Sequence, residues 1–247
     1  MSSSYSPDCP HRVDRVAMRH RWDSLTFLHW PYDPAVVQDL LPEGLAVETY
    51  DGAAWVGLVP FTMLVSRGRE GTRPLFEFPE TNVRTYVRDP SGLTGVWFFS
   101  LDAGSLSAVI TARATYRVPY FWSEMSVDRR GETITYVTRR RWPGPHHAAS
   151  RVEIEIGKRY RAAELGDFDH YLTARWALFG TWGGRVLTAK AEHPRWELHR
   201  ARAAMWHDEL VAAAGLSPPE GEPVVHWSSG VDVNVGYPAF PRSTRAL

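Results

Sequence analysis

The residues most able to do chemistry lie together in one short segment, Glu80–Val87, with the sequence ETNVRTYV. Side chains alternate between the two faces of a β-strand, so Glu80, Asn82, Arg84 and Tyr86 share one face. A carboxylate can exchange protons, a guanidinium can hold an anion, and the amide and the phenol can form hydrogen bonds. The spacing therefore predicts acid–base and anion-binding groups on one side of a strand.

The meaning of this cluster depends on whether its face meets water or an enclosed interior. The opposite face carries Thr81, Val83, Thr85 and Val87, which are all β-branched and suited to packing. If the polar face meets solvent, its glutamate and arginine form a surface pair worth roughly 0–1 kcal/mol. If the face points inward, the buried charges need partners and hydrogen bonds, as in many functional sites. We favour the interior interpretation.

Two further segments add polar side chains to the candidate site. Tyr120 and Glu124 have the same parity on a strand, which predicts that both lie on one face. His29 shares a face of the expected strand Trp22–Trp30 with apolar neighbours, where its ring needs a hydrogen-bond partner. A core histidine with a backbone partner is the preferred interpretation, and contact with a ligand is the alternative that we retain.

Other common chemistries lack their sequence signatures. The ten histidines show no pairing around a glutamate of the kind found in helical zinc sites, so no metal is expected. Residues Gly104–Ala108 (GSLSA) lack the second glycine of a nucleophile elbow, which disfavours a serine hydrolase. There is no GxGxxG motif and no P-loop, and no cofactor is expected.

Composition narrows the partners and the compartment. The 247 residues carry a formal net charge of +0, which disfavours nucleic acid as a partner. No run approaches the roughly 20 apolar residues that span a bilayer, so no membrane association is expected. Cys9 is the only cysteine, which fits a reducing compartment and predicts a cytoplasmic protein. Unpaired sheet edges and exposed tryptophans would allow a homo-oligomer.

Strand-like segments dominate the chain. Glycine, proline and aspartate separate runs of β-branched and aromatic residues, and these runs do not alternate regularly with helical ones. The pattern predicts an α+β fold with a strongly curved, mostly antiparallel sheet or cone-like barrel and helices packed outside. The expected strands are Trp22–Trp30, Leu45–Tyr50, Ala54–Val65, Glu80–Arg88, Gly95–Leu101, Arg117–Val127, Thr133–Arg140, Arg151–Ile156, Arg185–Glu192 and Val224–Val235.

Helices are expected in four places, and one domain is expected overall. The first is Ala35–Leu41, the second is capped by Asp102 and runs through Arg113, and the others are Phe168–Trp182 and Arg200–Ala214. The Pro/Gly-rich stretches are too short to be domain linkers. We therefore expect a single domain over residues 21–240, with a flexible N-terminal tail at 1–20 and a C-terminal tail at 241–247.

Six ordered motifs resemble the uncharacterised YqjF-like family. The resemblance runs from about Trp22 to Pro238, which is nearly the whole chain. The family's name carries no function. The motifs are FLHW at 27–30, WVGLVPF at 55–61, ETNVRTYV at 80–87, FFSLD at 98–102, PYFWSEM at 119–125 and LTARW at 172–176.

The YqjF-like family in turn resembles acetoacetate decarboxylase, which implies a cone-shaped antiparallel barrel with helices outside and an active site within. The decarboxylase uses a lysine of lowered pKa that forms a Schiff base with its ketone substrate. The corresponding stretch here is Val118–Phe121, with Tyr120 at the position of the lysine. The resemblance also matches Glu80 with the acidic site residue of the decarboxylase.

These observations predict a small-molecule site inside the barrel. Arg84 would hold a carboxylate or enolate, Glu80 would act as acid or base, and Tyr120 would donate a hydrogen bond. The reaction would be lyase-like or hydratase-like chemistry on a small carboxylate or ketone, without a covalent lysine. The expected ligand contacts are Asn82, Tyr86, His29 and Glu124.

Two alternatives remain open from the sequence. One is a non-catalytic binding or scaffold protein that keeps an apolar cavity and uses Glu80 and Arg84 as an internal pair. The other is Schiff-base catalysis through Lys190, which with Lys158 makes up the full set of lysines.

Overall fold

The computed structural model describes residues 5–66, 74–115, 118–144 and 147–240, and the strands in these ranges form one 13-stranded sheet. The pairings are antiparallel except for two, which join β6 to β7 and to β10. The strands are β1 (Val16–Tyr32), β2 (Ala46–Val47), β3 (Thr49–Tyr50), β4 (Ala53–Ser66), β5 (Phe76–Arg88), β6 (Thr94–Ala103), β7 (Tyr120–Arg130), β8 (Thr133–Trp142), β9 (Ala149–Arg159), β10 (Ala177–Trp182), β11 (Arg185–Glu192), β12 (Leu198–Asp208) and β13 (Val224–Gly236).

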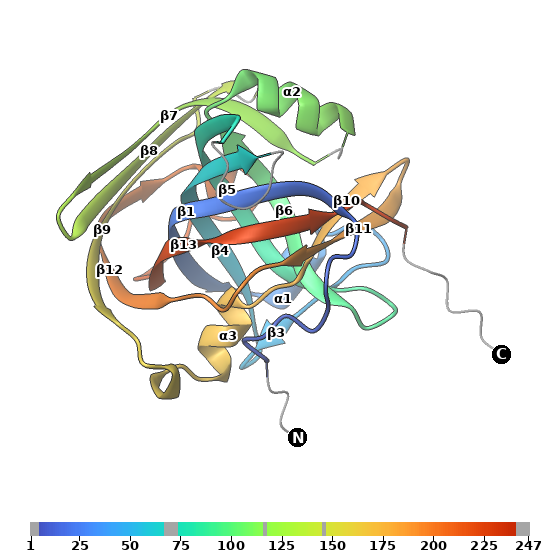
Figure 1. Ribbon diagram of the computed structural model, residues 1–247, viewed down its shortest axis with the longest axis horizontal. Helices are drawn as coiled ribbons and strands as arrows, with labels where there is room; N and C mark the ends of the chain where they lie inside the picture. Colours follow the sequence, from blue (N-terminus) through green and yellow to red (C-terminus); the bar gives the residue numbers. More distant parts are fainter. Residues whose placement is uncertain (1–4, 67–73, 116–117, 145–146, 241–247) are drawn as a thin grey trace.

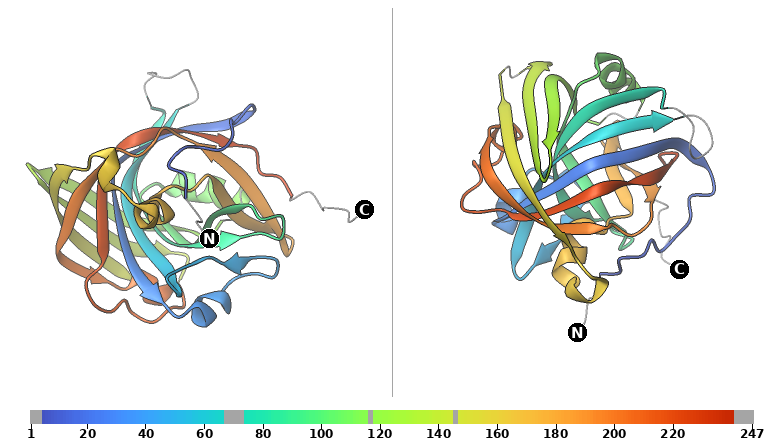
Figure 2. Two further views of the ribbon diagram at one scale, coloured as in Figure 1. Left: turned by 90° about the horizontal axis from the view of Figure 1, so that it is seen from below. Right: turned by 60° about the vertical axis from the view of Figure 1, so that its left-hand side comes forward.

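The sheet closes on itself twice because two strands change neighbours along their length. β13 pairs with β12 in its first half and with β11 near its end. β6 pairs with β10 near its start and with β7 at its end. The strands β13, β1, β4, β5 and β6 thus form a wall shared by two closed rings. β10 and β11 close one ring, and β7, β8, β9 and β12 close the other on the opposite side of the wall (Figures 1 and 2).

Both faces of the shared wall are therefore interior. Alternate residues of each strand point into opposite rings, as the two-residue period of a strand requires. In the ring closed by β7, β8, β9 and β12, large apolar side chains fill the space, including Leu28, Leu58, Val83, Ile134 and Ile154. The other ring holds a second set of apolar clusters and a cavity.

The predicted fold class is confirmed by this strongly curved sheet. The helices are few and short: α1 (Pro34–Gln38), α2 (Leu106–Thr115), α3 (Asp167–Thr173), α4 (Leu210–Ala213) and a 3₁₀ turn at Ala162–Glu164. The helix expected at Ala35–Leu41 is present but ends earlier, and Asp33 caps its start because the Asp33 side chain accepts a hydrogen bond from the Ala35 amide. No helix among the described residues is both long and apolar enough to cross a lipid bilayer.

Two of the expected helices are wrong. Residues 198–208 form β12, paired with β9, and only Leu210–Ala213 is helical in the region predicted as Arg200–Ala214. Alanine and arginine favour helices, and a bulge between Ala203 and Met205 interrupts the alternation that would have indicated a strand. The helix predicted from residue 168 ends at Thr173, and β10 follows it between β6 and β11.

Asp102 is not the cap of α2, contrary to the sequence-based expectation. It lies in β6, and its carboxylate accepts two hydrogen bonds from Arg140 of β8, at 2.9 and 2.7 Å, and one from the Ser123 hydroxyl of β7 at 2.8 Å. Asp102 and Arg140 are both 0% exposed. The Arg140 guanidinium also stacks on the Phe121 ring at 3.7 Å, so this pair ties three strands together inside the apolar ring.

The ends of the sheet differ from the domain boundaries expected from the sequence. β1 begins at Val16, so part of the expected N-terminal tail belongs to the sheet. Residues before it also pack on the fold, as when the Tyr5 ring meets the Tyr171 ring edge-on at 5.1 Å. The first four residues, the expected tail 241–247 and Arg117, the first residue of an expected strand, lie outside the described residues.

Replacing Arg140 should test the buried pair. In Arg140→Ala the Asp102 carboxylate keeps its burial but loses its counter-charge, so unfolding free energy should fall by about 3–5 kcal/mol. Arg141→Ala on the same strand breaks an ion pair with the exposed Glu124 and should cost about 1 kcal/mol or less. Urea unfolding of both variants makes the comparison, and equal losses would contradict this account.

Candidate functional site

A cavity of about 590 Å³ lies inside the ring closed by β10 and β11. The inward faces of β1, β4, β5 and β6 line one side of it. β10, β11, α2, the start of β7 and the connections that carry Arg175, His193 and Trp196 line much of the rest. The lining is mostly apolar, with Leu25, Phe61, Met63, Phe98 and Leu178 among its side chains. Such concave, largely apolar spaces with a few polar groups are typical of small-molecule sites.

The polar face of β5 points into this cavity. Glu80, Asn82 and Arg84 line it, and they are 2%, 4% and 8% exposed. The opposite face packs into the other ring, where Val83 joins the apolar core and the Thr81 hydroxyl lies 3.1 Å from that of Thr138. The alternation predicted from the sequence thus sorts the two faces between a cavity and a core.

Tyr86 lies one step beyond these residues and is fully buried. It is not among the cavity-lining residues. Its hydroxyl donates to the carbonyl oxygen of Leu172, so the proton between Tyr86 and His29 must come from the His29 ring, whose Nε2 lies 2.5 Å from that hydroxyl.

His29 is likewise absent from the lining and 0% exposed. Burial, followed by the charge of Arg84, holds the pKa of His29 well below its usual range. Tyr86 and His29 therefore lie outside the cavity lining, next to Arg84, and are not placed to contact a ligand as the sequence predicted.

Glu80 and Tyr120 form one hydrogen-bonded pair in the cavity wall. The Tyr120 hydroxyl donates to Oε2 of Glu80 at 2.9 Å, from the first residue of β7, which pairs with β6. Burial raises the pKa of Glu80 to about 8, the Asp102 charge adds to the rise, and the Tyr120 hydrogen bond opposes it. Burial also raises the pKa of Tyr120 well above its usual value. At neutral pH Glu80 is therefore mostly a neutral acid, and Tyr120 is a neutral donor.

Arg84 lacks an anionic partner among the described residues. No ion pair joins it to Glu80, in contrast to the internal pair of the scaffold alternative, and its buried Nε and Nη2 atoms find no hydrogen-bond acceptor there. Its guanidinium carbon lies 5.3 Å from the Phe27 ring centroid and 5.7 Å from that of Tyr86. Two aromatic rings thus hold the guanidinium in place while its charge stays uncompensated, which favours an anionic ligand.

Arg175 is a second buried arginine in the lining that the sequence interpretation missed. It follows α3, where its Nε donates to the Tyr171 carbonyl oxygen and its Nη1 donates to the buried carboxylate of Glu48. Its Nη2 is buried and without an acceptor among the described residues. The guanidinium carbon lies 4.3 Å from the Tyr86 ring centroid, so both arginines contact the same ring. The LTARW motif contains Arg175, but a predicted helix offered no reason to place it in a cavity.

An aromatic wall borders the two arginines. His193 lies 4.9 Å from Trp196 and 4.4 Å from Trp176 between ring centroids, and Trp22 stacks on Trp196 at 6.3 Å. Burial lowers the pKa of His193 to about 4, so the ring is neutral at physiological pH. His193, Trp196 and Trp22 line the cavity. Sequence spacing gave no signal for this wall because its members come from different strands and connections.

Glu124 is not in the cavity, which corrects the sequence-based prediction. Its side chain is 68% exposed and forms an ion pair with Arg141 on the outside of β7. The physical reason is that β7 pairs with β6 only as far as Trp122, so beyond this point β7 no longer borders the cavity. The face that carries Tyr120 meets solvent at Glu124, whereas Ser123 on the other face is buried and donates to Asp102.

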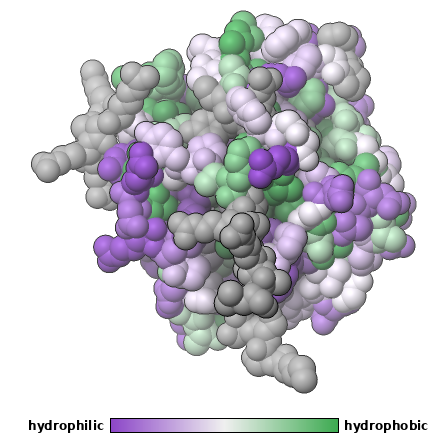
Figure 3. All heavy atoms as spheres, turned by 90° about the vertical axis from the view of Figure 1, so that its right-hand side faces the viewer, coloured by the Kyte–Doolittle hydropathy of each residue, from purple (hydrophilic) through white to green (hydrophobic). Residues whose placement is uncertain are grey.

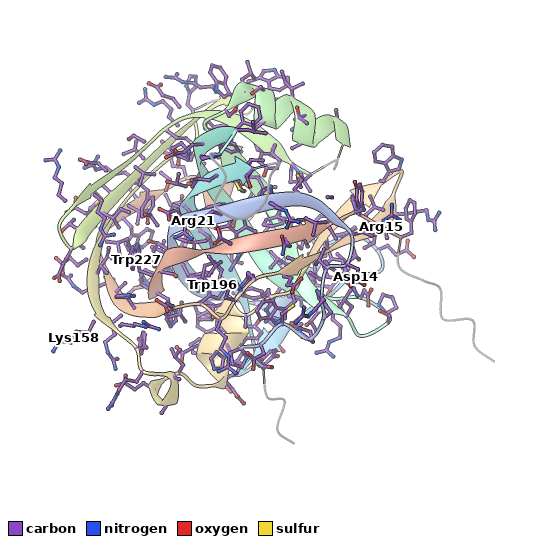
Figure 4. All side chains as sticks on the ribbon, in the orientation of Figure 1. Asp14, Arg15, Arg21, Lys158, Trp196 and Trp227 are labelled. Carbon is purple, nitrogen blue, oxygen red and sulfur yellow. The ribbon has the colours of Figure 1, made fainter. Side chains whose placement is uncertain are left out.

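Neither lysine lines the cavity. Lys158 is exposed near the end of β9, and Figure 4 shows its side chain extending away from the molecule. Lys190 is exposed on β11, where its neighbours Ala189 and Ala191 are buried. Because alternate residues of a strand face opposite sides, Lys190 points away from the ring. The alternative of Schiff-base chemistry through Lys190 loses its structural basis.

Solved structures show which class of fold this is. An acetoacetate decarboxylase from Legionella pneumophila matches with a TM-score of 0.62 and 12% identity, covering 96% of this chain and 93% of that one. The enduracididine biosynthesis enzyme MppR complexed with pyruvate matches with a TM-score of 0.61 and 10% identity, over 97% and 98%. An acetoacetate decarboxylase-like enzyme from Sphingomonas wittichii RW1 gives 0.60 and 13%, over 91% and 92%. The chain therefore has an acetoacetate decarboxylase-like fold.

The chain belongs to the DUF2071 family, described as an uncharacterized conserved protein, whose model matches residues 19–232. It is also 34% identical over 223 residues to the uncharacterized protein YqjF of Bacillus subtilis (strain 168), covering 87% of this chain and 89% of that protein. The family resemblance predicted from the six motifs is confirmed.

The Glu80 carboxyl should make stability depend on pH. Unfolding exposes Glu80 and returns its pKa from about 8 to 4.5, so the unfolded state binds fewer protons between these values. Stability should therefore be highest below about pH 4.5 for this group and fall as pH rises to about 8, by at most roughly 1.4 kcal/mol per pH unit.

Glu80→Gln removes this titration. The difference in unfolding free energy between the parent chain and this variant, measured by urea unfolding at a series of pH values, isolates Glu80 from the other titrating groups. We expect the difference to change in favour of the variant as pH rises. A difference that is constant between about pH 5 and pH 8 would show that Glu80 is already ionised in the folded state.

Proposed function

We propose that this protein binds a carboxylate-bearing or ketone-bearing small molecule in the cavity and performs proton-transfer chemistry on it. The observation that carries the proposal is that one cavity contains two polar groups of different kinds, Arg84 and Glu80, which we call its two polar stations. Arg84 offers an uncompensated buried guanidinium, and Glu80 offers a buried carboxyl whose pKa is raised to about 8. An anion holder and a proton carrier in one cavity suit lyase-like or hydratase-like reactions at a carbon next to a carbonyl group.

The roles follow from the protonation states. Near neutral pH, the neutral Glu80 donates its proton to an oxygen or carbon on which negative charge develops, and Tyr120 then stabilises the resulting carboxylate by the hydrogen bond that it already makes. In the reverse direction the Glu80 carboxylate removes a proton. A pKa close to the working pH allows both directions, which is the property required of a general acid–base residue.

The binding groups act by charge. Arg84 and Arg175 attract a carboxylate, and a buried guanidinium gains more from such a partner than an exposed one. Pyruvate is bound by MppR, which has the same fold, and this supports an acidic ligand for the cavity here. A covalent lysine has no part in the proposal, because both lysines are exposed.

The competing function is non-catalytic binding in the same cavity. Its support is the mostly apolar lining, which binds a ligand without any need for proton transfer. The two functions differ in what Glu80 does: catalysis requires its proton, whereas simple binding tolerates an uncharged amide in its place.

Solvent hydrogen exchange tests the proposal without knowledge of the natural substrate. Pyruvate, 4-oxopentanoate and 7-oxooctanoate are incubated with the protein in D₂O, and NMR follows deuterium entering the carbon next to each ketone. We expect faster exchange with at least one of the three acids. Glu80→Gln should lower the enzymatic rate about 100-fold or more. Arg84→Gln should raise the acid concentration needed for half-maximal rate about tenfold or more.

Two control variants show whether the effects come from the cavity residues or from the loss of any carboxyl or arginine. Glu77→Gln changes an exposed carboxyl of the same strand, and Arg151→Gln changes an exposed arginine of β9, so both should behave as the parent chain. Binding of an acid that survives Glu80→Gln while no exchange is detected in any protein would favour the non-catalytic function. Exchange that is unaffected by Glu80→Gln would remove Glu80 from the proposal.

A further inference from the structure

The two polar stations of the cavity lie at different depths. Glu80 pairs with Phe61 of β4 and Arg84 with Gly57, so four residues separate the stations on each strand. At a rise of about 3.3 Å per residue, their Cα atoms are about 13 Å apart. The Arg84 guanidinium lies between the rings of Phe27 and Tyr86, and no ion pair between it and Glu80 is found among the described residues. A pyruvate-sized molecule is short compared with this Cα separation, whereas a longer molecule can span it.

The deep end of the cavity is its anion-binding end. Arg84 and Arg175 both lie against the Tyr86 ring, and each has buried N–H groups without an acceptor among the described residues. Glu48 compensates Arg175 only in part, because the same carboxylate also pairs with Arg88 at 2.7 Å. His193 beside them is neutral, since burial lowers its pKa to about 4. The deep end therefore carries net positive charge.

Apart from Glu80, Asn82, Tyr120 and a few other polar residues, the rest of the cavity is mostly apolar up to its mouth. Leu75 and Phe76 line the mouth at the start of β5 and are 54% and 52% exposed. The lining face of α2 offers Ala108 and Ala112, and its neighbour Ile110 is 55% exposed. Figure 3 shows hydrophobic side chains gathered near the centre of the face that carries β10 and β11. Exposed apolar residues around an opening favour the entry of an apolar group.

The volume agrees with this division. At about 30 Å³ per water molecule, a cavity of about 590 Å³ holds the equivalent of roughly 20 waters. A ligand of a few heavy atoms at the deep end would leave most of this apolar volume to water. Drug-sized ligands are usual for cavities of about 300–1,000 Å³.

We infer that the ligand is an amphipathic acid, with a carboxylate at Arg84 and Arg175 and a long apolar chain or ring system that extends past Glu80 to the mouth. This inference rests on the proposed function and names its ligand class. The group that Glu80 acts on lies several carbon atoms from the carboxylate, at the depth of Tyr120. The length of the ligand thus links the two stations.

A chain-length series tests the inference. Butanoate, hexanoate, octanoate, decanoate and decan-1-ol are titrated into the full chain, and binding is measured by calorimetry and by the fluorescence of the cavity tryptophans. We expect Kd to fall about fourfold for each added methylene until the cavity is filled. Arg84→Gln should raise the Kd of decanoate about tenfold or more and change that of decan-1-ol by about twofold or less.

Two substitutions on α2 test the path of the chain. Ala108→Trp places a large ring in the lining and should weaken decanoate while leaving butanoate unchanged. Ile110→Trp on the exposed face of the same helix is the matched control and should affect neither acid. The two α2 variants keep Arg84, so this test stands even if Arg84→Gln does not fold.

The outcomes separate the inference from the proposed function. If Kd does not depend on chain length but still rises in Arg84→Gln, the long ligand is wrong and the carboxylate site stands. If decanoate and decan-1-ol bind equally and Arg84→Gln has no effect, the carboxylate site itself is wrong. If Ala108→Trp and Ile110→Trp behave alike, the chain does not pass along α2.

Discussion

Strand β5 is buried on both faces, and the arrangement of the whole molecule depends on this constraint. It belongs to a wall that closes two rings of strands, so each of its side chains must enter one interior or the other. The β-branched face enters the ring that is filled with apolar side chains. The polar face has only the other ring, and polar groups in an interior need partners or a ligand. A cavity beside β5 is the consequence of this division.

The two rings treat buried charge in opposite ways. In the apolar ring, Arg140 meets the Asp102 carboxylate with two hydrogen bonds, and the pair is closed to solvent. In the cavity ring, Arg84 is held by aromatic rings but meets no carboxylate among the described residues. The first arrangement joins strands, and the second leaves N–H groups of Arg84 without an acceptor among the described residues. This difference supports a structural role for Arg140 and the proposed ligand-binding role for Arg84.

The fold shared with acetoacetate decarboxylases does not carry a shared nucleophile here. Tyr120 stands where the resemblance places the Schiff-base lysine, and its hydroxyl serves as a hydrogen-bond donor to Glu80. Burial gives Glu80 a pKa of about 8, so proton transfer remains possible without a covalent intermediate. Proteins with one fold can differ in chemistry in this way, because the site residues and not the strand order determine the reaction.

The sequence by itself determined the curved, mostly antiparallel sheet, the family, and the shared face of Glu80, Asn82 and Arg84, because alternation and β-propensity are local properties. Three features needed the tertiary structure. A bulge in β12 hid its alternation, which suggested a false helix, and β7 parts from β6 after Trp122, which carries Glu124 away from the cavity. Arg175 and the aromatic wall reach the cavity from distant segments, which no spacing reveals. The Arg84 guanidinium lies between the rings of Phe27 and Tyr86 and meets no carboxylate of the described residues, and only packing decides that, because Phe27 reaches it from another strand.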